Sequence, residues 1–316
     1  MITQEYRRRL QRANYRLVGS NQHAGVKLCL WTKKSIKTGG KAFCYKQRFY
    51  GIQSHRCLQM TPDLPFCNLD CKYCWRDPTT ASKSWEGEID GPEEIIEGSI
   101  EAQKKLLTGL GGINHSKKHL NEAMNPVHAA ISLEGEPTLY PYLNELIVGF
   151  HKRGFTTFLV TNGTRPDVLR GLQVLPSQLY LSLSSPNKNV FETLQRPVTN
   201  ELWTNIMETI KIFPLLKTRK VIRLTLIKDI NMEQIKEYAA LIRTANPDFI
   251  ECKSYMSVGY SRNRLPYDSM PTHKEIIEFS KMLSEELGWK IEDEKVDSRV
   301  VLIKNPEGCE RWLQKI

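Results

Sequence analysis

Three cysteines stand close together in the segment PFCNLDCKYCWRD, which covers residues 65–77. Cys67, Cys71 and Cys74 have the spacing C-x3-C-x2-C, and the aromatic residue Tyr73 comes directly before the last of them. Structural zinc normally takes four protein ligands, so zinc bound here would need a fourth ligand from elsewhere in the chain. Iron–sulfur clusters are also held by cysteine thiolates, and a [4Fe–4S] cluster held by only three has one open iron for a substrate or cofactor. The motif therefore predicts metal binding, and it favours an open-iron cluster over zinc.

The composition is that of a soluble globular protein of the reducing interior of the cell. The chain has 316 residues, of which 40% are hydrophobic and 25% charged, and both fractions are ordinary for a soluble protein. It contains no apolar run near 18 residues and no apolar core of a secretory signal at its N-terminus, so neither a membrane span nor export is expected. We therefore predict a cytoplasmic location, where the eight cysteines are metal ligands or catalytic thiols rather than a disulfide framework.

The net charge of +10 comes from one end of the chain. Residues 1–56 contain thirteen lysines and arginines and a single acid, Glu5, so this segment carries +12 and the remainder −2. A concentrated positive charge is typical of a protein with a polyanionic partner such as nucleic acid, although a solvated basic helix and loop would look the same. Five arginines are expected to form one basic helix available to RNA: Arg7, Arg8, Arg9, Arg12 and Arg16.

Short apolar runs alternate with longer helical patterns over most of the chain, which predicts an α/β fold with a parallel sheet. The predicted strands after the first are residues 128–134, 155–161, 178–184, 220–227, 248–256 and, near the C-terminus, 299–304. The predicted helices are residues 91–107, 140–154, 200–213, 231–245 and 271–288. We expect a basic N-terminal extension (residues 1–57), an α/β domain (58–288) and a C-terminal strand and tail (289–316).

The candidate motifs follow predicted strands, which places them at one edge of the sheet. The cysteine loop comes after a predicted first strand near residues 58–64, and the segments EGEPT, TNGT and YMSVGY follow later strands. Sites in parallel α/β folds gather at the carboxyl ends of the strands. These segments are therefore expected to open onto the same face of the protein.

The cysteine motif resembles the signature of radical S-adenosylmethionine (SAM) enzymes. The resemblance implies a partial (β/α)6 TIM-like barrel and a [4Fe–4S] cluster on Cys67, Cys71 and Cys74. It also implies SAM bound to the open iron and its cleavage to methionine and a 5′-deoxyadenosyl radical. Cofactor-binding positions carried over from the family are Tyr73, Gly135, Glu136, Asn162, Ser182 and Ser184. In this interpretation the Glu136 carboxylate faces the amino group of SAM, although each position taken singly is equally consistent with a turn or a cap.

A second set of cysteines, Cys29, Cys44 and Cys57, lies in and just after the basic segment. Their spacing alone is as consistent with three buried thiols as with metal ligands. Together with the segments MTPDLPFCNLDCKYCWRD, SLEGEPTLYP, TNGT and YMSVGYSR, however, they resemble the 4-demethylwyosine synthase family over roughly residues 25–290. This resemblance implies that the three cysteines hold a second [4Fe–4S] cluster.

The resemblance also implies a reaction and its partners. It is the condensation of pyruvate with N1-methylguanosine in the anticodon loop of tRNA-Phe, giving the tricyclic base 4-demethylwyosine. Pyruvate could be held by a Schiff base on Lys46 or by the open iron of the second cluster. The chain is expected to act as a monomer with an external flavodoxin- or ferredoxin-like electron donor. The alternatives are a radical SAM enzyme acting on a different RNA or protein, and a non-catalytic RNA-binding protein with structural zinc.

Overall fold

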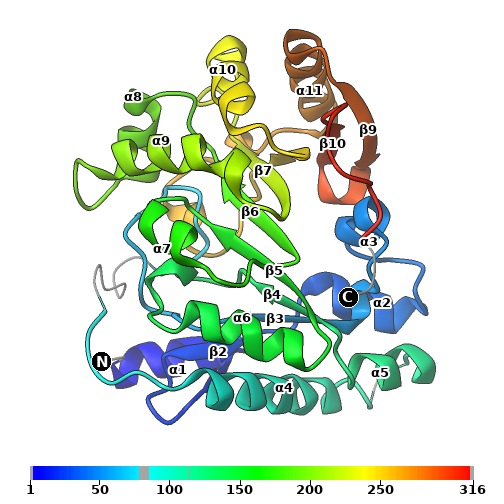
Figure 1. The fold of residues 1–316 in the computed structure, drawn as a ribbon. Coiled ribbons are helices and arrows are strands. Elements are labelled where there is room, and N and C mark those ends of the chain that lie inside the picture. The colour runs from blue at the N-terminus through cyan, green and yellow to red at the C-terminus, as the bar shows by residue number, and fades with distance from the viewer. Residues whose placement is uncertain (1–2, 78–84, 113, 314–316) are drawn as a thin grey trace.

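The computed structural model describes residues 3–77, 85–112 and 114–313. One ten-stranded sheet forms its centre, in the order β1-β2-β3-β4-β5-β6-β7-β8-β10-β9 (Figure 1). The strands are β1 (Arg16–Val18), β2 (Ala24–Val26), β3 (Cys57–Thr61), β4 (His128–Ile131), β5 (Thr156–Thr161), β6 (Gln178–Ser182), β7 (Arg219–Leu226), β8 (Phe249–Ser254), β9 (Lys290–Lys295) and β10 (Val300–Lys304).

The six strands β3 to β8 pair in parallel in chain order. This arrangement confirms the predicted α/β class and the partial six-stranded barrel. The flanking strands β1, β2, β9 and β10 are antiparallel and extend the sheet at both edges. The sequence did not predict β1 and β2 because each has only three residues, too few to show a period. The predicted extension and C-terminal segment thus both contribute strands to the central sheet.

All five predicted helices are present, within a few residues of the expected bounds. The α-helices are α1 (Gln4–Arg12), α2 (Leu30–Thr38), α3 (Tyr45–Tyr50), α4 (Pro92–Thr108), α5 (Lys117–Ala123), α6 (Leu143–Lys152), α7 (Pro166–Gly171), α8 (Lys188–Val190), α9 (Leu202–Ile212), α10 (Ile235–Ala245) and α11 (His273–Leu287). In α11, Thr272 and Glu275 form a capping box, and Gly288 ends the helix in the left-handed conformation. The helices missed are short, with nine residues or fewer.

The basic helix is shorter than expected. Arg7, Arg8, Arg9 and Arg12 lie in α1, whereas Arg16 begins β1, so the prediction of one helix carrying all five arginines was wrong. Asn14 has a φ of 62°, a left-handed conformation that an α-helix cannot contain. This residue turns the chain back into the β1–β2 hairpin.

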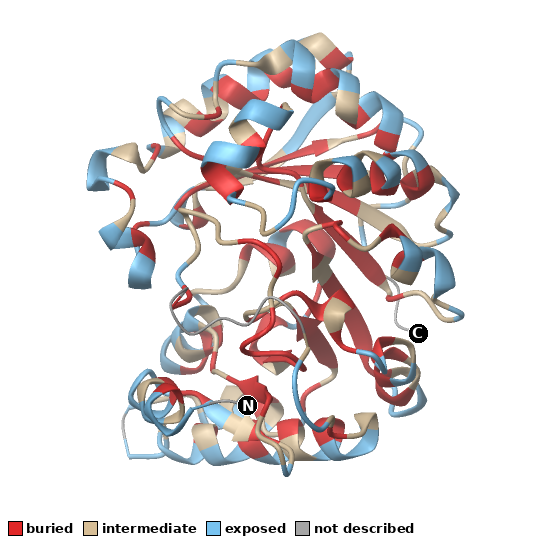
Figure 2. Ribbon diagram, turned by 90° about the vertical axis from the view of Figure 1, so that its left-hand side faces the viewer, coloured by how far each residue is buried: buried red, intermediate tan, exposed pale blue. Residues whose placement is uncertain are grey.

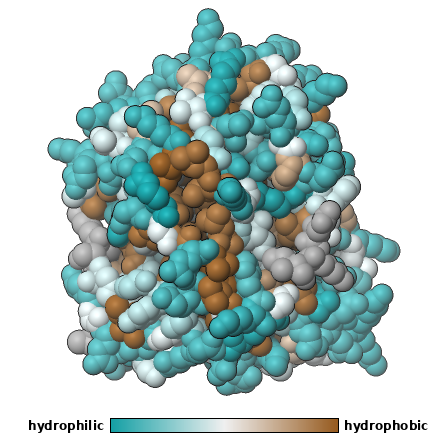
Figure 3. Space-filling view, in the orientation of Figure 1, coloured by the Kyte–Doolittle hydropathy of each residue, from teal (hydrophilic) through white to brown (hydrophobic). Residues whose placement is uncertain are grey.

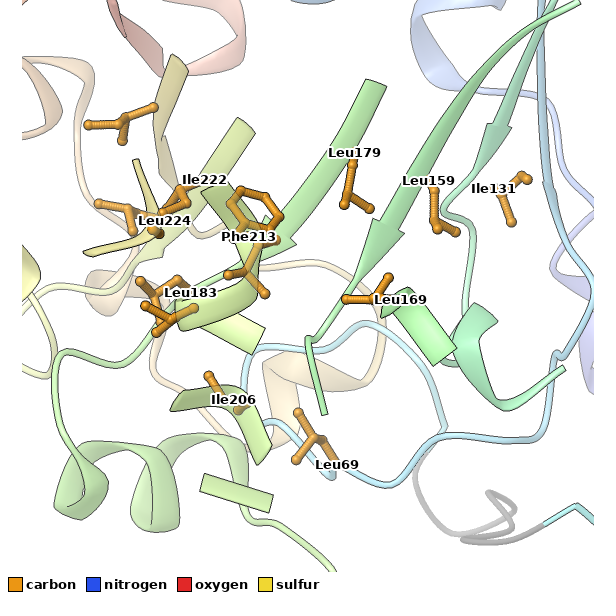
Figure 4. Close-up of a cluster of buried hydrophobic side chains, with 14 of the residues drawn as sticks. Leu69, Ile131, Leu159, Leu169, Leu179, Leu183, Ile206, Phe213, Ile222 and Leu224 are labelled. Carbon is orange, nitrogen blue, oxygen red and sulfur yellow. The ribbon is translucent and has the colours of Figure 1, made fainter. Parts of the chain in front are cut away.

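The main hydrophobic core lies between the sheet and the helices that cover it. Leu159, Leu179 and Phe213 are fully buried members of this core, and Figure 4 shows them gathered with other aliphatic side chains. A second core occupies the opposite side of the strands, where Phe158 and Tyr180 pack with aromatic residues of α3. In Figure 2 the strands are accordingly mostly buried, whereas the helices expose their outer sides. Helix α3 therefore brings part of the N-terminal segment onto the inner side of the partial barrel.

The face of the protein seen in Figure 3 is mostly hydrophilic, with a band of hydrophobic residues that runs down its middle and smaller hydrophobic areas beside it. Among the described residues, no helix is both long enough and apolar enough to span a bilayer.

Candidate active site with two cysteine-lined cavities

The first cavity, of about 310 Å³, lies at the carboxyl ends of the parallel strands. Cys67, Cys71 and Cys74 line it from the loop after β3. Strand-end residues on its wall include Gly135, Glu136, Asn162 and Ser182. The prediction that three of the motif segments open onto one face is confirmed. The fourth segment, residues 255–260, does not line this cavity and instead packs on the cysteine loop, where Tyr260 N donates to Trp75 O at 3.1 Å.

The spacing of the three sulfurs suits a cluster better than a single ion. Among the residues that the structure describes, neither cysteine trio has its three sulfurs within 4.8 Å of one another. Tetrahedral zinc has Zn–S bonds of about 2.3 Å, which puts its sulfurs roughly 3.8 Å apart. Burial raises the pKa of Cys67 to about 12 and also raises the pKa of Cys71. A bound metal would supply the positive charge needed to deprotonate these thiols.

Arg76 is a buried cation beside the cysteine loop that the sequence analysis did not single out. Its Nη2 donates to Leu69 O at 2.9 Å, whereas its buried Nη1 has no partner among the described residues. Burial acts to lower the pKa of Arg76, but Cys67 and Cys74 hold it above its ordinary value. An unpaired guanidinium N–H next to three thiols is a suitable donor to an anionic iron–sulfur cluster. The residues of this cavity therefore fit such a cluster.

The carboxylate of Glu136 is occupied by the protein's own donors. It accepts hydrogen bonds from Thr138 Oγ1 at 2.6 Å, Thr161 Oγ1 at 2.6 Å and Asn162 N at 2.7 Å. These bonds join the loop after β4 to the end of β5. Glu136 thus shapes the cavity wall, and its contact with the SAM amino group stays a prediction.

The remaining predicted cofactor residues have different environments. Asn162 lines the cavity and its Nδ2 donates to Asn68 Oδ1 at 2.9 Å. Ser182 and Tyr73 also line it, and the Ser182 hydroxyl bonds no other described residue. Ser184 is fully buried outside the lining, where its Oγ accepts from Thr225 N at 3.2 Å. The side chain of Ser184 also hydrogen-bonds that of Tyr73, which lines the cavity, so the assignment of Ser184 to cofactor binding stays a prediction.

Replacing Gly135 with alanine is expected to destabilise the cavity wall. Gly135 has a φ of 75°, and a Cβ there would lie 2.0 Å from Asp63 O. Backbone strain and the steric clash together should cost about 2–4 kcal/mol in the free energy of unfolding, measured with chemical denaturant. Gly154→Ala is the matched control, because Gly154 has a φ of 74° with nothing within 4 Å of its Cβ position. Equal losses for the two variants would contradict the steric argument.

The second cavity, of about 240 Å³, contains the other cysteine trio. Cys29 and Cys44 are the N-cap residues of α2 and α3, and Cys57 begins β3. Thiolates at helix N-termini are favoured by the helix dipole. Burial raises the pKa of both Cys44 and Cys57 to about 12. Three half-buried thiols that line one cavity with cations nearby fit a second iron–sulfur cluster. Helices α2 and α3 lie between the cysteines, which explains their wide spacing in the sequence.

Lys46 extends into this cavity from the first turn of α3 and is only 8% exposed. Its Nζ lies over the rings of Phe158 and Tyr180, 4.7 and 4.6 Å from their centroids. Among the described residues, no carboxylate or carbonyl oxygen pairs with this amine. Burial, followed by the charge of Arg223, lowers the pKa of Lys46. The side chain is therefore a buried amine with an increased neutral fraction.

A buried charged network forms one wall of the second cavity. Arg223 and Glu251 are register partners on β7 and β8, and Arg223 Nε donates to Glu251 Oε2 at 3.0 Å. Tyr45 and Tyr50 donate to the two oxygens of the same carboxylate at 2.9 and 2.8 Å. Arg223 Nη2 also donates to Tyr45 OH at 2.7 Å, and the hydrogen bonds of this guanidinium to described residues come from Nε and Nη2, not from Nη1. Lys253 lines the cavity as a further cation.

The two cavities adjoin each other. Trp75, Ser132 and Arg223 line both of them. A molecule held near Lys46 would therefore lie next to the space bordered by Cys67, Cys71 and Cys74. The second trio lies toward the amino end of the strands, where Cys57 begins β3, and the first trio follows the carboxyl end of the same strand, so the two cavities adjoin along the inside of the barrel.

The arginines of α1 have two kinds of environment. Arg9 forms ion pairs with Glu5 and with Asp77, which ties α1 to the segment after the cysteine loop. Arg8 and Arg12 are exposed on α1, and Arg16 is exposed on β1. Arg7 is half-buried, with a buried Nε that has no hydrogen-bond partner among the described residues.

The fold and the first cysteine site define a radical SAM protein. The profile of the radical SAM superfamily matches residues 61–242, and a profile described as wyosine base formation matches residues 244–305. The chain is 49% identical to the SAM-dependent tRNA 4-demethylwyosine synthase of Pyrococcus abyssi, over 93% of this chain and 86% of that protein. The enzyme of the same name from Methanocaldococcus jannaschii is 40% identical, over 96% and 97%. The chain belongs to the tRNA 4-demethylwyosine synthase family.

Two solved structures resemble this one over almost the whole chain. A structure of TYW1 with a lysine–pyruvate adduct bound has a TM-score of 0.87 at 39% identity, covering 96% of this chain and 97% of the other. A crystal structure of archaeal TYW1 has a TM-score of 0.81 at 36% identity, covering 99% and 100%.

Proposed function

We propose that this protein condenses N1-methylguanosine in the anticodon loop of tRNA-Phe with pyruvate to form 4-demethylwyosine. Membership of the family supports the reaction type. The observation that carries the proposal is the position of Lys46. This unpaired buried amine shares the second cavity with Cys29, Cys44 and Cys57, and that cavity adjoins the one lined by the first cysteine trio. The alternative of a non-catalytic zinc protein explains neither this amine nor the wide spacing of the sulfurs.

In this proposal the two cysteine trios hold two [4Fe–4S] clusters. Cys67, Cys71 and Cys74 hold the cluster that binds SAM, and Cys29, Cys44 and Cys57 hold the second. When bound and reduced, the first cluster and SAM supply a 5′-deoxyadenosyl radical, which takes a hydrogen atom from the N1-methyl group. Arg76 donates a hydrogen bond toward the first cluster, and Ser182 and Tyr73 form polar parts of the SAM pocket. The reductant is an external flavodoxin- or ferredoxin-like protein.

Lys46 holds pyruvate in this proposal. Its neutral amine attacks the carbonyl carbon, water leaves, and a Schiff base forms. The lysine–pyruvate adduct in the related TYW1 structure supports this role over capture by iron alone. The methylene radical of the guanosine then adds to the imine carbon, and the bond to the carboxylate carbon breaks. That carbon leaves as CO2 and its unpaired electron passes to a cluster. The exocyclic amino group of the guanine displaces the Lys46 amine, which closes the ring and frees the lysine. Because the Lys46 cavity adjoins the first cavity, the adduct needs no movement between sites.

Arg223 binds the carboxylate of pyruvate in this proposal, through its Nη1. Removing the guanidinium is expected to raise the pyruvate concentration for half-maximal adduct formation at least tenfold, because a charge-assisted hydrogen bond contributes about 1.5–3 kcal/mol. The test uses Arg223→Met combined with Glu251→Gln, so that no buried carboxylate is left unpaired, and traps the adduct with borohydride. Glu251→Gln alone is the control, since it keeps the guanidinium. An unchanged half-maximal concentration in the double variant would exclude Arg223 as the carboxylate ligand.

The tRNA would approach over the N-terminal segment, which contributes most of the positive charge. Exposed Arg8, Arg12 and Arg16 are available to phosphates. Trp75 is 41% exposed and lines both cavities, so its ring can stack on a base turned out of the anticodon loop. We place the protein in the cytoplasm as a monomer, because its proposed substrate is tRNA and one chain contains both cavities.

The test of this function is the product formed on tRNA. Anaerobically reconstituted protein is given SAM, a reductant and tRNA-Phe bearing N1-methylguanosine, with and without pyruvate, and the digested nucleosides are analysed by mass spectrometry. We expect a tricyclic base only when pyruvate is present. 5′-Deoxyadenosine without that base would support the alternative of a radical SAM enzyme for another substrate.

A further inference from the structure

A group of metal-ligating side chains lies outside both cavities, between α5 and the short 3-10 helix η1 (Ser54–Arg56). His55 comes from η1, and His119 and Glu122 come from one side of α5. A ligand atom from each of the three lies within 4.8 Å of the others, and this is the one such trio among the described residues. His55 Nε2 is 2.7 Å from Glu122 Oε2, and the two imidazole rings have centroids 4.8 Å apart.

The surrounding residues hold these side chains in place. Ser116, the N-cap of α5, has its Oγ 3.0 Å from His119 Nδ1. A Cβ at Gly40 would lie 2.6 Å from His119 Nε2, so the absence of a side chain at Gly40 leaves space beside that nitrogen. The His55 side chain is 9% exposed, whereas Glu122 is one-third exposed. The trio is thus supported on its buried side and open to water on the other.

We propose that His55, His119 and Glu122 bind one divalent transition-metal ion of the zinc type. Two imidazoles and one carboxylate are a ligand set typical of zinc, with water in the fourth position. The imidazoles argue against magnesium and calcium, which prefer oxygen ligands. A hydrogen-bonded His55–Glu122 pair explains two of the three side chains without a metal, but it does not explain why the second imidazole converges on the same point.

The position of the trio suggests what the ion would do. η1 leads directly into Cys57, and α2, which starts after Cys29, packs against both η1 and α5. A metal that joins His55 to α5 would therefore fix η1 and the packed helix α2, and with them the positions of Cys57 and Cys29. The ion is structural in this proposal, and it acts on stability rather than on the reaction.

The test measures zinc in protein whose iron content is complete, so that free cysteines do not bind zinc instead. Protein loaded with iron and sulfide is equilibrated with Zn²⁺, passed through a desalting column and analysed for both metals. The wild-type chain is expected to retain one zinc ion more per molecule than the His119→Gln variant. Zinc should also raise the thermal unfolding midpoint of the wild-type chain by a few degrees and leave that of the variant unchanged. His115→Gln is the matched control, because His115 lies close in sequence but outside the trio.

A second variant protects the test against a folding defect. Glu122→Gln keeps the size of the side chain and is expected to lose the same zinc and the same thermal shift. Equal zinc retention by wild type, His119→Gln and Glu122→Gln at equal iron content would overturn the proposal. Because the readout is metal content and stability, failure of this site would leave the proposed tRNA reaction unaffected.

Discussion

Replacing Lys46 with alanine is expected to abolish the pyruvate adduct and to lower formation of the tricyclic base by at least about 1000-fold, as for loss of a covalent catalyst. The loss follows from the position of the amine: it is the lysine in the second cavity with no oxygen partner, whereas Lys253 Nζ donates to Ser298 O at 2.7 Å. Adduct formation is measured by borohydride trapping followed by peptide mass spectrometry. Iron content and SAM cleavage should be unchanged.

Lys41→Ala is the control for this substitution. Lys41 belongs to the same basic segment but is exposed and lines neither cavity. It should keep wild-type adduct formation. A trapped adduct that survives in the Lys46→Ala variant, or that maps to another lysine, would show that iron or a different amine holds pyruvate.

Substitutions in the two cysteine trios are expected to separate radical generation from product formation. Cys71→Ala should lose about half the iron and essentially all SAM cleavage, a fall of at least about 1000-fold in 5′-deoxyadenosine, because the cluster that binds SAM is lost. Cys44→Ala should also lose about half the iron, yet keep SAM cleavage while losing the tricyclic base. The measurements are iron content, 5′-deoxyadenosine and modified nucleoside, made on the same samples.

Cys309→Ala is the matched control, since Cys309 lies outside both cavities. It should retain all the iron and both products. If Cys44→Ala kept its full iron content, the second trio would consist of buried thiols rather than cluster ligands.

Much of this architecture could be predicted from the sequence because its signals are local. The parallel strands are short apolar runs, and their carboxyl ends carry the motifs, so order along the chain was enough to place the first cysteine trio beside residues 134–137 and 161–162. The second trio could be grouped only through the family resemblance. Its members are brought together by helices α2 and α3, whose nine and six residues are too short for a reliable periodic pattern.

The parts that were missed depend on side-chain contacts between distant segments. The Glu136 carboxylate accepts four hydrogen bonds from protein donors in the fold. Ser182 ends β6, whereas Ser184 lies beyond the strand and is fully buried. Arg223 and Glu251 did leave a signal. Each is a charged residue inside a strand expected to be buried on both sides, and such charges are rare unless they are paired. Two opposite charges on neighbouring strands could have been predicted to meet.

The central claim is that a radical formed in the first cavity acts on the methyl group of the tRNA base, which then joins the pyruvate held in the second. The most direct test supplies the reconstituted protein with tRNA-Phe whose N1-methylguanosine carries a deuterated methyl group, together with pyruvate and SAM. We expect deuterium to appear in 5′-deoxyadenosine and the tricyclic base to form in proportion to it. 5′-Deoxyadenosine without deuterium, from protein that still forms the tricyclic base, would contradict the account.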